Sequence, residues 1–187
     1  LFNEGDVNID TTANGTVAAD NDGIQVSKAF GLGDVFVNTA AAINAGDEGI
    51  EVLSLGHDGN VDITTNMGST ILAGDDGISS LRYFGDGNLN VSANDAIEAG
   101  DDGIESVSIV SEGDVNIATG DGGTPGDGSD GGTILAGDDG VSVVKVLGGG
   151  NIDVDVNADI NAGDEAVGIF RTLSGGAGST INVDVDG

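Results

Sequence analysis

The chain lacks cysteine, has one proline and one histidine, and carries only four basic residues among 187. Without cysteine there is neither a disulfide framework nor a thiol nucleophile, which suits a secreted bacterial protein that avoids disulfide chemistry. No stretch is long and apolar enough to cross a membrane. The sequence begins without methionine and shows no signal peptide, so we expect a mature or excised segment.

The shortage of positive charge limits the classes of partner. Thirty-three acidic residues give a net charge of −29, which argues against binding to nucleic acid or to anionic lipid because both carry negative charge. The same charge favours cations, high salt, or a basic or uncharged partner such as glycan. Aromatic residues make up only 3%, yet 38% of the chain is apolar, mostly Val, Ile, Leu and Ala. We therefore expect a folded core rather than an acidic disordered tail.

A glycine followed by Asp or Asn and an alternating apolar segment recurs along the whole chain. It recurs every 26 to 28 residues, with one interval of 37 that contains an inserted loop at 121–130. Periods of this size are typical of solenoids. The coils of this solenoid are expected to start near Gly5, Gly33, Gly59, Gly87, Gly113, Gly150 and Gly178.

Each repeat contains three short strand-like segments. In the second repeat they are "DVFVN" (34–38), "AINA" (42–45) and "GIEVLSL" (49–55), and no segment follows a helical period. The sequence predicts an all-β, single-domain parallel β-helix over residues 1–187, with three strands per coil and roughly six and a half coils. Stacking at about 4.8 Å per coil gives a rod about 30 Å long. The stacking also predicts a ladder at one turn, made of Asp6, Asp34, Asn60, Asn88, Asp114 and Asn151.

A pair of acids before a glycine recurs at another turn, as in "NAGDEGI" (44–50) and "LAGDDGI" (72–78). Stacking would place these acids in a double column, where like charges repel unless cations or salt offset them. Oxygen-rich sites of this kind suit Ca²⁺, and the alternative is a solvated, salt-adapted acidic turn. The glycines of this turn are expected to allow either positive φ or close approach. The candidate Ca²⁺ ligands are Asp22, Asp47, Asp75, Asp76, Asp101, Asp102, Asp138, Asp139 and Asp164, with Glu48 and Glu165 beside them.

All positive charge falls in one column. Lys28, Arg82, Lys145 and Arg171 each lie five residues after the turn glycine or its Ala166 counterpart. We expect these cations to neutralise neighbouring acids. The alternative is that they meet an acidic face of another copy.

The third strand of each repeat carries apolar residues at adjacent positions, which a strand with one wet face should not do. Either a bend returns consecutive residues to the core, or an apolar stripe packs against another chain. Together with the basic column, this stripe supplies the candidate interaction residues Lys28, Leu53, Leu55, Arg82, Tyr83, Ile109, Lys145, Val146, Phe170 and Arg171.

Catalysis finds little support. His57 stands alone, and the acids follow the repeat, whereas a catalytic site normally breaks it. We expect no enzyme, although β-helical polysaccharide lyases and hydrolases that use carboxylate clusters are the alternative. The loop 121–130 either binds a cation through its aspartates or is a flexible excursion.

The segments "GDVNI" (5–9), "TILAGDDGI" (70–78) and "AINAGDEGI" (42–50) resemble the repetitive β-helical passenger regions of bacterial autotransporters and other large surface adhesins. The resemblance extends along the whole chain. It implies a secreted or cell-surface structural rod, adhesin or filament subunit without catalytic residues. The expected partners are other copies or adjoining repeats, end to end or laterally, and a glycan or host surface. The ends of the chain show no polar cap, so we expect a window from a longer repeat protein or a stacking subunit.

Overall fold

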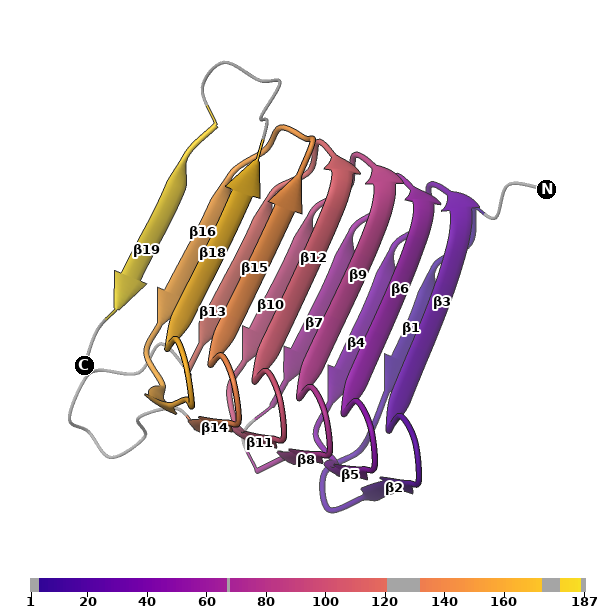
Figure 1. Ribbon diagram of the computed structural model, residues 1–187. Coiled ribbons are helices and arrows are strands. Elements are labelled where there is room, and N and C mark those ends of the chain that lie inside the picture. Colours follow the sequence, from indigo (N-terminus) through magenta and orange to yellow (C-terminus); the bar gives the residue numbers. More distant parts are fainter. Residues whose placement is uncertain (1–3, 67, 121–131, 173–178, 186–187) are drawn as a thin grey trace.

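The computed structural model describes residues 4–66, 68–120, 132–172 and 179–185. These residues form nineteen strands and no helix, wound into three parallel sheets (Figure 1). The prediction of a parallel β-helix with three strands per coil is therefore confirmed. A helix of the length and hydropathy needed to cross a membrane is absent from the described residues.

Each coil contributes one strand to each sheet. Sheet A contains β1 (Val7–Asp10), β4 (Val35–Thr39), β7 (Val61–Thr65), β10 (Leu89–Ala93), β13 (Val115–Thr119), β16 (Ile152–Val156) and β19 (Ile181–Val185). Sheet B contains the short strands β2 (Thr16–Ala19), β5 (Ala42–Ala45), β8 (Thr70–Ala73), β11 (Ala96–Ala99), β14 (Thr133–Ala136) and β17 (Asp159–Asn161). Sheet C contains β3 (Ile24–Gly31), β6 (Ile50–His57), β9 (Ile78–Gly85), β12 (Ile104–Ser111), β15 (Val141–Val146) and β18 (Val167–Thr172).

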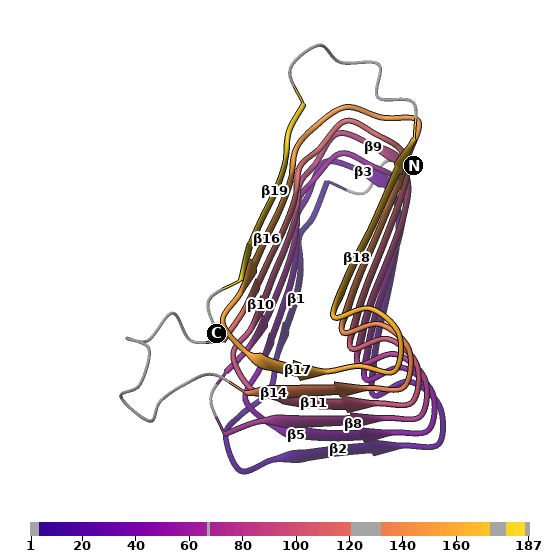
Figure 2. The same cartoon turned by 60° about the vertical axis from the view of Figure 1, so that its left-hand side comes forward.

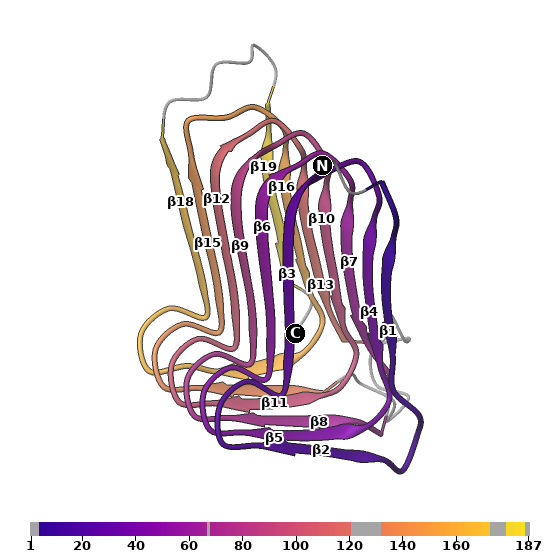
Figure 3. The same cartoon turned by 90° about the vertical axis from the view of Figure 1, so that its right-hand side faces the viewer.

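The three sheets form the sides of every coil, with sheets A and C as the long sides and sheet B as the short one (Figures 2 and 3). Equivalent residues pair directly across coils, as in the series Ile50, Ile78 and Ile104 of sheet C. All three of these side chains are fully buried. The core is therefore a set of continuous columns, and a single coil has no core of its own.

Sheet A follows the simple alternation expected of a half-buried strand. In β4, Val35 and Val37 point into the core, while Phe36 and Asn38 point outward. The same parity repeats in the other fully flanked strands of this sheet, with Val, Ile or Leu inside. This alternation is what makes a period of two residues visible in the sequence.

The glycine after each acid pair is required by close approach. A Cβ added to Gly77 would lie 2.3 Å from Cγ2 of Ile97 and 2.5 Å from the carbonyl oxygen of Gly103. Gly77 is not among the described glycines with positive φ. Of the two expected reasons for this glycine, the structure therefore supports contact between coils.

The predicted Asp/Asn ladder is present at the turn between sheets C and A, which we call the Asx corner. Oδ1 of Asp34 accepts the N–H of Asn60 at 2.8 Å, and Oδ1 of Asn60 accepts the N–H of Asn88 at 2.9 Å. Because only a side-chain oxygen is needed, Asp and Asn serve equally. The bonds run between coils rather than within the turn, and they continue through Asp6, Asp114 and Asn151.

Candidate functional site

The acid pairs gather at the turn between sheets B and C, which we call the acidic corner. Its members are Asp22, Asp47, Glu48, Asp75, Asp76, Asp101, Asp102, Asp138, Asp139, Asp164 and Glu165. The second acid of a pair binds the next coil: Oδ1 of Asp76 accepts the N–H of Asp102 at 3.1 Å, and Oδ1 of Asp102 accepts the N–H of Asp139 at 3.0 Å. The expected stacking of the acids is therefore built into the backbone hydrogen bonding.

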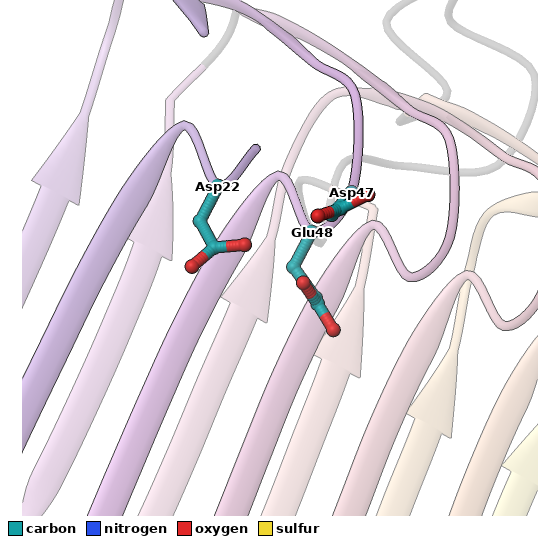
Figure 4. A group of neighbouring side chains, drawn as sticks. All are labelled: Asp22, Asp47 and Glu48. Atoms are coloured by element: carbon teal, nitrogen blue, oxygen red, sulfur yellow. The ribbon is translucent and has the colours of Figure 1, made fainter. Parts of the chain in front are cut away.

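Three groups of carboxylates in the described residues have oxygens that all lie within 4.8 Å of one another. Figure 4 shows the first, in which Asp22 comes from one coil and Asp47 and Glu48 from the next. The second group is Asp101, Asp102 and Asp138, and the third is Asp138, Asp139 and Asp164. Seven of the nine predicted ligands thus fall into such groups, while Asp75 and Asp76 do not.

Crowding at the acidic corner disfavours ionisation. Burial raises the pKa of the Asp76 carboxyl to about 7, although the N–H donated by Asp102 acts in the opposite direction. Burial also raises the pKa values of Glu48 and Asp102, with the charges of neighbouring carboxylates adding to the effect. A hydrogen bond with Asp139 raises the pKa of Glu165. A divalent cation would offset this repulsion, and carboxylate oxygens are the ligands that Ca²⁺ prefers.

The basic column corrects our expectation. Lys28, Arg82 and Lys145 are 4%, 2% and 0% exposed, and they point into the solenoid. They therefore do not present themselves to another copy, although the charges of Asp114 and Glu112 still favour the charged form of Lys145. Arg171 occupies the same inward register beside Lys145 and is partly buried.

Main-chain carbonyl oxygens at the Asx corner hold three of these four cations. Nζ of Lys28 donates to the oxygens of Gly5 and Gly33, and Nζ of Lys145 donates to that of Gly113. A guanidinium nitrogen of Arg171 donates to the oxygen of Gly150 at 2.8 Å. Inward carbonyls left without a donor would cost free energy, so the cations serve the corner. Burial lowers the pKa of Lys145 to about 8 and that of Arg82 to about 10.

His57 belongs to the same interior. It is buried, its Nε2 lies 2.5 Å from the carbonyl oxygen of Gly33, and burial lowers its pKa. Buried polar atoms without a hydrogen-bond partner cluster nearby, namely both terminal nitrogens of Arg82 and the hydroxyls of Ser54, Ser80, Ser106, Ser108 and Ser111. Within the described coils, the inner face of sheet C is thus polar over its second half.

The outer face of sheet C is apolar over this same second half of its strands. Its outward rows, which we call the apolar face, contain Leu53, Leu81, Val107, Val144 and Phe170 in one row and Ala29, Leu55, Tyr83, Ile109 and Val146 in the next. The first row begins at the polar Ser27 and the second ends at the polar Thr172. Leu55 is 40% exposed and Phe170 is 58% exposed. Of the two readings of the third strand, the structure therefore supports an outward stripe. Six of the ten candidate interaction residues lie on it, and the four basic ones do not.

One further column was missed in the sequence. Phe30, Phe84, Val110 and Leu147 have φ between 52° and 57°, and all are exposed. Each lies seven residues after a turn glycine, and Gly56 holds the same place in the second coil. This periodic spacing could have identified the column, since large apolar residues stand where a bend is needed.

Sheet A carries a shallow groove on its outer face. The groove encloses about 350 Å³ over β7, β10, β13 and β16, and the carboxylates of Asp62, Asp153 and Asp155 line it. Between them, Nδ2 of Asn90 donates to Asp62 at 2.6 Å, and Nδ2 of Asn116 donates to Asn90 at 2.8 Å. Such amides and carboxylates can bind hydroxyl groups.

The inserted loop 121–130, for which the sequence predicted either a cation site or a flexible excursion, lies outside the described residues. Comparisons of the chain with protein-family models, with curated proteins and with solved structures found no match. The likeness to autotransporter passenger regions and surface adhesins therefore stays a prediction beyond the β-solenoid itself.

Proposed function

We propose that the chain is a structural or adhesive rod of a prokaryotic cell surface, which acts outside the cell as a stiff spacer. The proposal is supported above all by the constant register. Core columns, the Asx ladder and the acidic corner all continue from coil to coil in the described residues. A uniform stack suits a load-bearing element, whereas a catalytic centre needs residues placed out of register.

The acidic corner gives the rod its response to cations. We propose that Ca²⁺ binds the three carboxylate groups, bridging successive coils because each group draws ligands from two of them. Ion binding that requires the folded corner stabilises the fold by mass action. Adjoining repeats or further copies are the proposed end-to-end partners, and a glycan or host surface is the proposed adhesive target.

Thermal unfolding followed by circular dichroism tests this proposal. The midpoint should rise in millimolar CaCl₂ but not in NaCl of matched ionic strength. Asp138→Asn, at the carboxylate shared by two groups, should reduce the rise. Asp114→Asn is the matched control, because Oδ1 of Asp114 serves the Asx corner, where Asn is already used. Equal midpoints in Ca²⁺ and Na⁺ would remove Ca²⁺ from the proposal and leave a screened acidic surface.

A carbohydrate-active β-helix is the second candidate, and the sheet A groove is the observation that favours it. Its three carboxylates lie among amides that suit sugar hydroxyls. Incubation with a panel of neutral and acidic polysaccharides, followed by assays for new reducing ends and for unsaturated products, decides between the two. The rod proposal expects neither product. Cleavage lost in Asp153→Asn but kept in Asp10→Asn, which lies on sheet A outside the groove, would replace the rod with an enzyme.

A further inference from the structure

The apolar face of sheet C is unusual for so acidic a chain. Two outward rows without a charged side chain run across its strands, which lie side by side in Figure 1. Leu81 and Val107 pair directly at the centre of these rows. The carboxylates on this face, Glu51 and Glu105, lie in the row nearest the acidic corner. Contiguous exposed apolar surface of this kind marks contact sites rather than ordinary solvent-facing surface.

The column at the end of these strands strengthens the argument. Phe84 has φ 57° and is 54% exposed, and Val110 has φ 55° and is 40% exposed. Left-handed backbone is strained for such residues, above all for a β-branched one. Gly56 takes the same bend with φ 60° and without that strain. The bend itself does not require large side chains. The ring of Phe30 lies against Gly56 of the next coil, and Phe30 is still 52% exposed.

We propose that the apolar face docks against the same face of a second copy, with a two-fold axis parallel to the solenoid axis. This inference rests on the proposed structural role and names the lateral partner of the rod. Both faces have the same coil spacing, about 4.8 Å, so their side chains can interdigitate row by row. A closed two-fold contact also buries the apolar faces of both copies at once.

The orientation decides which side chains face each other at the margins. A two-fold axis parallel to the strands would bring the two acidic corners together, with columns of carboxylates facing each other. An axis parallel to the solenoid reverses the strands of the partner, so each acidic corner lies across from the Asx corner of the other copy, where three of the six ladder residues are Asn. The uncharged rows then meet at its centre, and the carboxylates of Glu51 and Glu105 stay at the rim.

The whole outer face of sheet C sets the largest area that such a pair can bury. Six strands of up to eight residues span roughly 29 Å by 26 Å, or about 750 Å², and the apolar face is the central part of this area. A standard interface buries about 800 Å² on each partner, so a contact centred on the apolar face belongs to the smaller and weaker class. With −29 charges on each copy, long-range repulsion opposes association, so the dimer should strengthen as salt is added.

Sedimentation equilibrium of the 187-residue chain in 0.05 M and 0.5 M NaCl tests the proposal. We expect a monomer–dimer equilibrium with a dissociation constant below about 100 µM in the higher salt. Leu81→Lys should weaken it at least about tenfold, because it places a charge at the centre of the contact. Ser92→Lys is the matched control, since it makes the same charge change on the outer face of sheet A. Phe84→Gly should weaken the dimer while leaving the fold intact.

Three outcomes would overturn the proposal. One is a chain that stays monomeric at about 1 mM in 0.5 M NaCl. Another is association that Leu81→Lys and Ser92→Lys weaken equally, which indicates charge effects alone. The third is open-ended growth that Leu81→Lys leaves unchanged, which indicates contact through the solenoid ends. None of these results bears on the Ca²⁺ response or on the absence of cleavage, so the lateral contact and the rod fail separately.

Discussion

Sheets A and C share one core but distribute polarity in opposite ways. In sheet A, Ile63 and its neighbours are inside, and Asp62 and Asn90 are outside. In the second half of sheet C, the buried positions hold Lys145 and Arg82, while Leu55 and Tyr83 face outward. The difference teaches that outward apolar residues of sheet C are not forced by the fold, because β7, β10 and β16 of sheet A build the same coils with polar outward residues.

The reversed polarity of sheet C concerns both its inner face, inside the solenoid, and its outer face, on the surface. Inside, the cations meet carbonyl oxygens at the Asx corner, which need donors. Outside, the ring of Phe30 lies against Gly56 of the next coil, and the proposed contact with a second copy would cover the apolar surface that stays exposed. The inner face can be tested by stability and the outer face by association.

The largest effect should come from placing a buried cation, of the kind that sheet C contains, in the interior of sheet A. Ile63 is fully buried in β7, and its surroundings are apolar. Ile63→Lys should lower the free energy of unfolding by about 3–5 kcal/mol, because it buries a charge without a partner. Ile63→Val, the size control, should cost about 1 kcal/mol. Urea unfolding measures both. A loss below about 1 kcal/mol for Ile63→Lys would mean that the two interiors are equivalent.

The next effect concerns alkaline pH. The pKa of Lys145 falls from 10.5 to about 8 on burial, so between these values the unfolded chain binds more protons than the folded one. Stability should therefore rise with pH in this window, by about 1–2 kcal/mol from pH 8 to 9.5. Lys145→Met should flatten the rise. Urea unfolding midpoints across this pH range measure the rise in stability. An equal rise in Lys145→Met would show that another group causes it.

A comparable effect is expected from the acidic corner. Because the pKa of Asp76 is raised to about 7 in the folded chain, its contribution to stability is full below pH 3.8 and is lost as pH rises through 7. The melting temperature should be about 3 °C or more higher at pH 5 than at pH 7.5. Asp76→Asn keeps an oxygen for the N–H of Asp102 and should reduce the difference, unlike Asp114→Asn at the Asx corner.

The smallest effect should separate the two outer faces. Phe84→Gly removes the strain of φ 57° and should change monomer stability by less than about 1 kcal/mol, towards greater stability. Phe36→Gly, on regular strand β4 of sheet A, should instead lower it by about 1 kcal/mol. Unfolding at concentrations too low for association compares them. Equal losses would show that Phe84 packs for the fold.

The repeat made most of the fold predictable. Alternation and the recurring Gly-Asp/Asn pair predicted three strands per coil, and the ladder through Asp34 and Asn60 follows from that register. The acidic corner was predictable for the same reason. The inward orientation of the Lys145 side chain was not predictable. Its parity matches the buried Val141 and Val143, but its charge indicates the surface. The inward carbonyl of Gly113 that resolves this conflict lies 32 residues earlier in the chain and leaves no local signal.

The reactivity of the lysines tests the inverted polarity of sheet C most directly. Lys28 and Lys145 are the two lysines of the chain, and both are buried. The chain would be treated at pH 8 with a small acylating reagent, native and in urea, and the labelled positions read by mass spectrometry. We predict that both lysines react in urea, whereas in the native chain only the terminal amine reacts at a comparable rate. Equal labelling of Lys145 in the two states would contradict the account, because the basic column would then lie at the surface.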